Sequence, residues 1–223
     1  MRSLIIMITV SLVSLAGCVT MPEKVPDEYL SEKSAEQAKN LEKMENAVIS
    51  KNHEVQAFKD KVEGASQKLK IEKGRLGIFK DEKKLLDEKQ KQYQLENDSA
   101  KIGENAKLVS EKEAEITSQV NRVEYSTAFR DHVKAQKEVA DAELSALVAE
   151  LNYEKSRIAK DYLVKRQVES TGEKKDKSSV DAEKYDEKYR AYLDKQREAL
   201  SAKKITREEA AVQLKITEDK LKR

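Results

Sequence analysis

Residues 41–79 read LEKMENAVISKNHEVQAFKDKVEGASQKLKIEKGRLGIF, and apolar residues return in this stretch at every seventh position. The first column consists of Leu41, Val48, Val55, Val62, Leu69 and Leu76. A companion column three residues further on is half polar and consists of Met44, Lys51, Phe58, Ala65, Glu72 and Phe79. Columns at this spacing form one stripe along a helix, which packs against a matching helix as a coiled coil. The stretch therefore predicts a long helix with a narrow apolar seam.

Two further apolar runs follow, namely Leu95, Ile102, Val109, Ile116 and Val123, and then Val133, Ala140, Leu144, Leu147, Leu151 and Ile158. The first run is out of phase with the 41–76 column, because residues 76 and 95 are 19 positions apart. The run from Val133 to Ile158 is interpreted as out of phase with the run from Leu95 to Val123. Changes of phase indicate either stutters within one coiled coil or a break between two helices.

Residues 96–103 gather asparagine, aspartate, serine and glycine, all of them turn formers, within a short stretch. A turn there gives two arms of nearly equal length, about residues 28–96 and 104–170. We therefore expect an antiparallel helical hairpin with its tip near residues 97–103. The alternative is one unbroken helix that pairs with a second copy of the chain. Polar seam residues such as Lys51 and Glu72 would make any association of copies weak.

The C-terminal part of the chain predicts a charged linker over residues 172–184, with Gly172 as the residue that follows the second arm. Beyond the linker, Tyr185, Tyr189 and Tyr192 recur on one helix face. These tyrosines either form the core of the tail or dock a partner. The first interpretation is favoured, because a tail this short has no other core.

A second short helix is expected to start at residues 206–209, Thr-Arg-Glu-Glu, which have the pattern of a capping box. Residues 185–223 would then form a helix-turn-helix unit. Ile205-Thr206 and Glu208-Glu209 resemble the short, SHOCT-like helical modules at the ends of many bacterial proteins. Lys204 stands where that family has glycine, and the likeness covers only about 25 residues. Such modules are associated with assembly, so the resemblance implies a contact role for the tail.

Residues 1–17 have the parts of a signal peptide: the positive charge of Arg2, an apolar run over 4–15, and small residues before Cys18. The motif at 15–18, Leu-Ala-Gly-Cys, resembles the lipobox of bacterial lipoproteins. The resemblance implies that the chain is cut before Cys18, that its sulfur carries diacylglycerol, and that its amino group carries a fatty acid such as palmitate. Val19, where inner-membrane lipoproteins usually have aspartate, by the same resemblance favours the outer membrane. Pro22 and Pro26 predict an extended tether over residues 18–30.

The composition argues against several classes of function. Lys and Arg number 44 against 42 Asp and Glu, and this near balance lacks the basic excess that nucleic-acid binding needs. Charged residues at 39% with six Gly, two Pro and no Trp are typical of long helices. His53 and His132 are isolated, and no phosphate loop or nucleophile elbow is present in the sequence. We therefore expect no enzymatic activity, no metal and no cofactor.

These features together predict an all-α protein. Its parts would be a signal peptide over 1–17, a lipidated tether over 18–30, the hairpin over 31–171, the linker over 172–184 and a pair of short helices over 185–223.

The favoured function is that of a lipid-anchored spacer or scaffold between the membrane and another envelope component, a protein or a polymer. It would be held at the outer membrane and face the periplasm. One alternative is an adhesin-like lipoprotein on the cell surface that binds external ligands. A second alternative is a relative of efflux adaptors. That family flanks its hairpin with lipoyl and β-barrel segments, for which no strand pattern is visible here.

Overall fold

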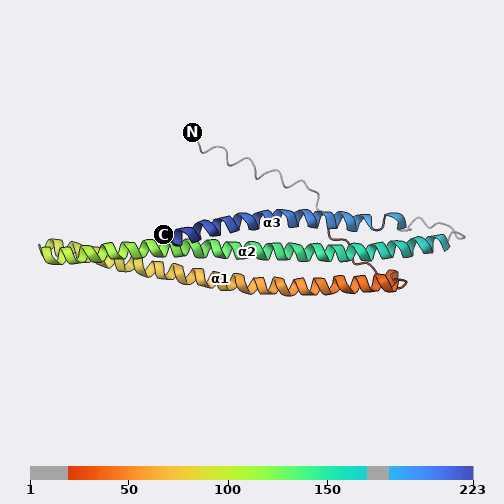
Figure 1. Cartoon of the computed structure of the whole chain (residues 1–223), viewed down its shortest axis with the longest axis horizontal. Coiled ribbons are helices and arrows are strands. Elements are labelled where there is room, and N and C mark those ends of the chain that lie inside the picture. The colour runs from red at the N-terminus through yellow and green to blue at the C-terminus, as the bar shows by residue number, and fades with distance from the viewer. Residues whose placement is uncertain (1–19, 170–180, 223) are drawn as a thin grey trace, which may run out of the picture. The chain divides into compact units, whose positions relative to one another are not determined.

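The computed structural model describes residues 20–169 and 181–222. Its long helices are α1 (Ala35–Leu95), α2 (Ser99–Glu169) and α3 (Glu187–Leu221), and its short 3-10 helices are η1 (Asp27–Leu30) and η2 (Ala182–Lys184) (Figure 1). These residues contain no strand, and the predicted all-α hairpin is confirmed. None of the described helices is long and apolar enough to cross a lipid bilayer.

The chain divides into two compact units, and each of the three long helices contributes to both. Unit 1 contains the described residues of Met1–Glu45 and Ala146–Glu198. Unit 2 contains those of Asn46–Ser145 and Ala199–Arg223. The signal peptide, Cys18, Gly172 and most of the predicted linker lie outside the described residues. Of the linker, residues 182–184 are described as η2.

In unit 2, α1 and α2 run antiparallel as the two arms of the hairpin. Ion pairs join Lys51 to Glu143 at 2.9 Å, Lys83 to Glu113 at 3.2 Å and Lys112 to Glu82 at 2.8 Å. The α1 residues of these pairs have higher numbers closer to the turn, whereas the α2 residues have lower numbers closer to it. The two differences are about equal, as expected for antiparallel helices. This pairing excludes the unbroken helix as the fold of the chain.

The turn of the hairpin occupies residues 96–98. Asn97 has a left-handed backbone with φ of 53°, and the amide of Asp98 donates to the carbonyl of Tyr93 at 3.1 Å, which closes α1. The carboxylate of Asp98 accepts the backbone N–H of Lys101 at 3.1 Å and caps α2. This hydrogen bond and the Lys101 ammonium lower the pKa of Asp98. The expected tip at 97–103 was therefore too long, because the cap at Asp98 starts the helix at Ser99.

The seam predicted for α1 is confirmed, since every residue of the two columns between 41 and 79 is buried or half-buried. The shift predicted for the third apolar run was wrong. Leu144 lies three full heptads after Val123, and Val133 belongs to the companion column that begins at Asn105. A single heptad frame therefore runs along α2 without a stutter. Leu95 is 85% exposed near the end of α1 and lies outside the core.

The first long helix begins later than expected. The first arm was expected to begin near residues 28–31, but Asp27 opens the short η1, and α1 starts after Ser34. The Ser34 hydroxyl accepts the amide of Gln37 at 3.1 Å, and the Gln37 side chain accepts the amide of Ser34 at 2.8 Å. This reciprocal capping box fixes the start of α1.

The expected pair of short C-terminal helices is wrong, because α3 is continuous from Glu187 to Leu221. It contains neither glycine nor proline, and Thr206 donates its hydroxyl to the carbonyl of Ala202 at 3.3 Å instead of capping a new helix. In unit 2, α3 lies antiparallel to α2 (Figure 1), with Lys203 on Glu138 at 2.8 Å and Lys220 on Glu124 at 3.0 Å.

Candidate functional site

The candidate site lies in unit 1, where residues 20–34, which we call the strap, pack against α2 and α3. Val25 and Leu30 are buried, and the Tyr189 hydroxyl donates to the carbonyl of Glu23 at 2.9 Å. Residues 20–30 had been expected to form an extended tether. Their contacts instead make them part of the core of unit 1, because Val25 and Leu30 lose their apolar surface there.

Tyrosine rings from three elements hold the strap. Tyr29 of η1 lies 5.7 Å from the ring of Tyr162 on α2 and 6.1 Å, edge-on, from the ring of Tyr185. Tyr185 in turn lies 5.7 Å from Tyr189 on α3. Aromatic pairs at these separations stabilise a core beyond the area that they bury.

The three tyrosines predicted from the sequence as core or docking residues do not act as one surface. Tyr185 is buried and Tyr189 is only 2% exposed, so a docking face that includes these two is wrong. Only Tyr192 remains half-buried at the surface. The reason is the strap, which covers the face of α3 that the sequence left without a partner.

A short hydrogen-bonded chain links the buried tyrosines. The hydroxyl groups of Tyr185 and Tyr189 are 3.5 Å apart. Tyr189 gives its proton to Glu23, so Tyr185 is the donor between the two. Burial, and then this hydrogen bond, raise the pKa of Tyr185 above its ordinary value of 10.0.

We expect unit 1 to lose stability as the pH rises above the ordinary tyrosine pKa of 10.0. The folded state keeps the Tyr185 proton where the unfolded state has released it. Stability is therefore complete below that pH and then falls by up to about 1.4 kcal/mol per pH unit. Denaturant unfolding at a series of alkaline pH values would measure this slope. The Tyr185→Phe variant should show a smaller slope, and equal slopes in both proteins would contradict the assignment.

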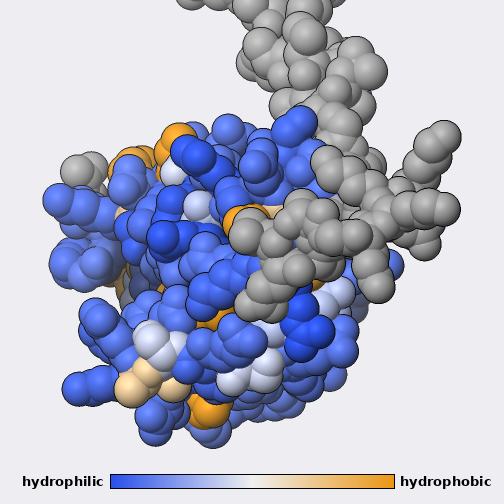
Figure 2. Space-filling model, turned by 90° about the vertical axis from the view of Figure 1, so that its right-hand side faces the viewer, coloured by the Kyte–Doolittle hydropathy of each residue, from blue (hydrophilic) through white to orange (hydrophobic). Residues whose placement is uncertain are grey.

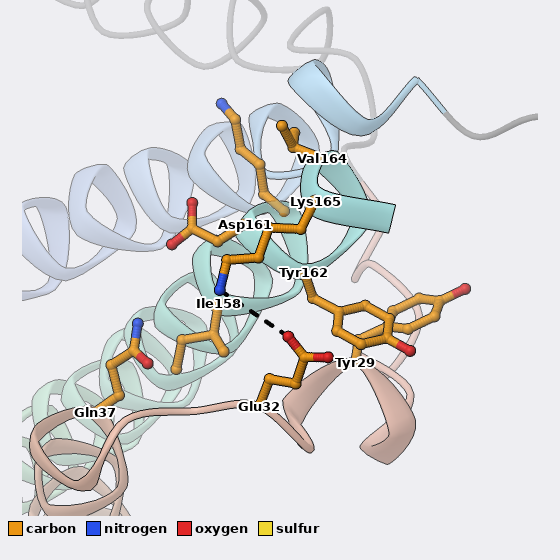
Figure 3. A pocket seen from close by; sticks show the side chains of 9 residues that line it. Tyr29, Glu32, Gln37, Ile158, Asp161, Tyr162, Val164 and Lys165 are labelled. Carbon is orange, nitrogen blue, oxygen red and sulfur yellow. Dashed lines mark ion pairs between the residues drawn. The ribbon is translucent and has the colours of Figure 1, made fainter. Parts of the chain in front are cut away.

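A cavity of about 500 Å³ lies beside the strap (Figure 3). Its walls come from the strap, the first turn of α1 and one stretch of α2: Tyr29, Glu32, Gln37, Ile158, Lys160, Asp161, Tyr162, Val164 and Lys165. Lys165 pairs with Glu32 at 4.0 Å, as the dashed line in Figure 3 marks, and Lys160 pairs with Asp186 at 3.0 Å. The cavity thus has charges of both signs, among which Lys160, Lys165 and Glu32 are in ion pairs, together with an aromatic wall.

The described residues offer no group of three or more His, Cys, Asp or Glu side chains that could hold a metal ion. His53 is exposed on α1. His132 on α2 contacts Gln136 through Nε2 at 3.0 Å, and its buried Nδ1 has no hydrogen-bond partner in the described structure. Neither histidine lines the cavity beside the strap. The surface shown in Figure 2 is mostly hydrophilic, with apolar side chains in small separate patches.

Polar side chains inside the seam of unit 2 form a second notable feature. Buried Asn105 donates to the carbonyl of Leu86 at 2.9 Å and to the side chain of Gln90 at 2.7 Å. Buried Gln119 donates to the carboxylate of Glu72 at 2.6 Å and to its carbonyl at 3.0 Å. Bonds of this kind can form in only one alignment of the arms, so they select the register.

Sequence reasoning marked Glu72 and Lys51 as polar seam residues but missed Asn105 and Gln119. The signal was present, because residues 105, 112 and 119 are seven apart and all polar. Lys51 binds Glu54 at 2.6 Å and Glu143 at 2.9 Å, and these contacts raise its pKa, the bond to Glu54 most. Tyr29 and Tyr162 were also missed, since nothing in the sequence brings them together.

Comparison with known protein families, curated proteins and solved structures finds no match for this chain. The resemblance of residues 15–18 to a lipobox and of residues 205–209 to a SHOCT-like module therefore rests on the quoted residues alone. Both stay predictions.

Proposed function

We propose that this protein is a lipid-anchored helical scaffold of the bacterial cell envelope. Cys18 carries the lipid, and the helical hairpin contacts a second envelope component, a protein or a polymer. This assignment rests on the lipobox pattern at 15–18 together with an antiparallel hairpin whose core is a heptad seam. The outer membrane, facing the periplasm, is the proposed location.

The observation that best supports a scaffold is the packing of the strap. Glu23, whose carbonyl accepts the Tyr189 hydroxyl, is only five residues after Cys18. Five residues span at most roughly 17 Å, so a lipid on Cys18 would keep unit 1 at the membrane surface. A packed strap suits a protein that holds a fixed position, whereas a long free tether suits one that searches a volume.

The other candidate functions have less support. Efflux adaptors need lipoyl and β-barrel segments, and residues 20–169 and 181–222 contain no strand from which to build them. An enzymatic role is not part of our proposal, because Lys165 and Glu32 in the wall of the cavity beside the strap pair with each other. The surface-exposed binder of external ligands differs from our proposal in location alone, so an experiment on location separates the two.

Mass spectrometry of the mature protein tests the anchor. We expect an N-terminal Cys18 that carries a diacylglyceryl thioether and a fatty acyl amide, because two or three acyl chains are needed for stable membrane attachment. The Cys18→Ala variant should lack the lipid mass. A mature wild-type protein with an unmodified Cys18, or with its N-terminus elsewhere, would contradict the proposal.

Trypsin treatment of intact and opened cells tests the location. The helices contain many lysine and arginine residues, so an accessible protein is cut readily. We expect the protein to survive in intact cells and to be degraded once the outer membrane is opened. Degradation in intact cells would instead support the surface-exposed binder and would contradict the periplasmic scaffold.

A further inference from the structure

An exposed apolar stripe lies on the outer face of α1 in unit 2. Ile71, Ile78 and Leu85 follow each other at seven-residue spacing and are 56%, 58% and 59% exposed. They lie apart from the seam that packs on α2, whose columns in this region contain Leu69 and Leu76. Single exposed apolar residues are ordinary, but a repeat at heptad spacing is the pattern of a coiled-coil contact.

Two glycines belong to the same face. Gly64 precedes Ile71 by seven residues, and Gly74 lies between Ile71 and Ile78 on the helix surface. A Cβ atom at either glycine would meet nothing within 4 Å, and neither glycine has a positive φ. The fold of one chain therefore does not require glycine at these positions, and glycine weakens a helix interior. Beside exposed isoleucines, glycine allows a second helix to approach closely.

A groove of about 350 Å³ borders the stripe, between α1 and α2. Arg75, which follows Ile71 by four residues and precedes Ile78 by three, is part of its wall. The remaining walls are Phe79, Glu115, Ser118, Gln119 and Arg122. This groove is lined mainly by charged and polar side chains, so the aliphatic stripe of a second copy does not enter it. A two-fold axis across the stripe instead places the row of aliphatic side chains of each copy against the same row of the other.

We propose that the outer stripe, which consists of Gly64, Ile71, Gly74, Ile78 and Leu85, is a contact between two copies of this chain. The two α1 helices cross antiparallel about a two-fold axis near Ile78. This contact does not depend on the lipid anchor or on the proposed location.

Charge favours the antiparallel arrangement. Arg75 precedes Ile78 by three residues and Glu82 follows it by four, and both side chains are exposed by about half. An axis near Ile78 therefore brings Arg75 of each copy opposite Glu82 of the second copy. These two attractive contacts would add to the pairs within each chain, which join Arg75 to Glu72 at 3.8 Å and Glu82 to Lys112 at 2.8 Å. A parallel, in-register pair would instead set Asp81 beside Glu82 of the second copy. Like charges at that position oppose the parallel arrangement.

Disulfide cross-linking of the full chain in cells tests the contact, because Cys18 is the only native cysteine. The Ile78→Cys variant should form a disulfide-linked dimer under mild oxidation. The Ile49→Cys variant is the matched control, because Ile49 is 55% exposed on α1 in the same unit but lies far along the helix from the proposed axis near Ile78. We expect at least about fivefold more dimer from Ile78→Cys, since a disulfide forms only when the Cα atoms are within about 7 Å.

Two further cysteine variants test the orientation. An antiparallel contact places Ile71 opposite Leu85 of the second copy. Ile71→Cys and Leu85→Cys should therefore form little dimer singly and much more when both are present in one chain. Equal dimer from Ile78→Cys and Ile49→Cys would overturn the contact. Efficient dimer from Ile71→Cys alone would overturn the antiparallel arrangement.

The Gly74→Leu change, made in the Ile78→Cys chain, separates association from folding. Leucine favours a helix more than glycine does, and the site is open in one chain, so the thermal midpoint should stay the same or rise. The larger side chain blocks the close approach of a second helix, so the dimer fraction should fall several-fold. A dimer fraction that does not change would contradict the proposal.

Discussion

Replacing Tyr189 with alanine should release the strap and lower the stability of unit 1 by about 3–5 kcal/mol, the usual cost of deleting a buried aromatic ring. The Tyr189 side chain is 2% exposed, contacts the ring of Tyr185 and holds Glu23 through its hydroxyl. The alanine variant therefore leaves a cavity and frees the chain near residue 23.

Hydrogen exchange measures this release where it occurs. The amides of Tyr29, Ser31 and Lys33 form hydrogen bonds within the strap and should exchange much faster in Tyr189→Ala. The Tyr189→Phe variant keeps the ring and loses one hydrogen bond, so it should cost only about 1 kcal/mol. Tyr192→Ala is the matched control on the same helix, because Tyr192 is only half-buried. Unchanged exchange in Tyr189→Ala would show that the strap is held by other contacts.

Replacing Gln119 with leucine should destabilise the hairpin of unit 2 by about 2–3 kcal/mol, the upper range for a hydrogen bond to a charged group. The Gln119 amide donates to the Glu72 carboxylate at 2.6 Å inside the seam. Leucine has a similar size but no donor, so the Glu72 carboxylate stays buried without this partner. Urea unfolding followed by circular dichroism gives the change, and Thr117→Ala on the exposed face of α2 provides a control.

The Glu72→Leu/Gln119→Leu double variant should recover the stability of the wild-type protein or exceed it. Two leucines replace a buried polar pair by an ordinary apolar layer, which commonly costs nothing or stabilises the protein. The difference between the double variant and the sum of the single variants gives the coupling energy of the pair. If the free energy of unfolding of the double variant falls by the sum of the two single changes, the two side chains act independently.

The parts of the fold that could be predicted from the sequence are those with a periodic or local signal. The column from Leu41 to Leu76 repeats without interruption, and its residues are indeed buried or half-buried. Asn97 and Asp98 are residue types that favour a left-handed backbone and a helix cap, and they form the turn. These features depend on neighbours in the chain, so their physical cause is visible in the sequence.

Other parts depended on distant contacts or on competing local signals. The strap is held by Tyr29, Tyr162 and Tyr189, which share no spacing and come from three elements. Residues 206–209 have the pattern of a helix start, but α3 continues through them. The reason is that no glycine or proline precedes them to end the helix. The cap at Ser34 and Gln37 does have a local signal, a serine followed three residues later by glutamine, although the first arm was expected to begin before it.

The strap also determines the order in which the protein can fold. Asn105 and Leu86 are 19 residues apart in the chain, whereas Glu23 and Tyr189 are 166 apart. A chain that emerges from its N-terminus can therefore close the hairpin long before α3 exists, because local contacts form first. The strap thus emerges before the hairpin and yet finds its partner on α3 only after the hairpin can close. A chain truncated before residue 185 would lose the hydroxyl of Tyr189 from Glu23 and the ring of Tyr185 from Tyr29, so we expect this segment to be cut more readily by proteases.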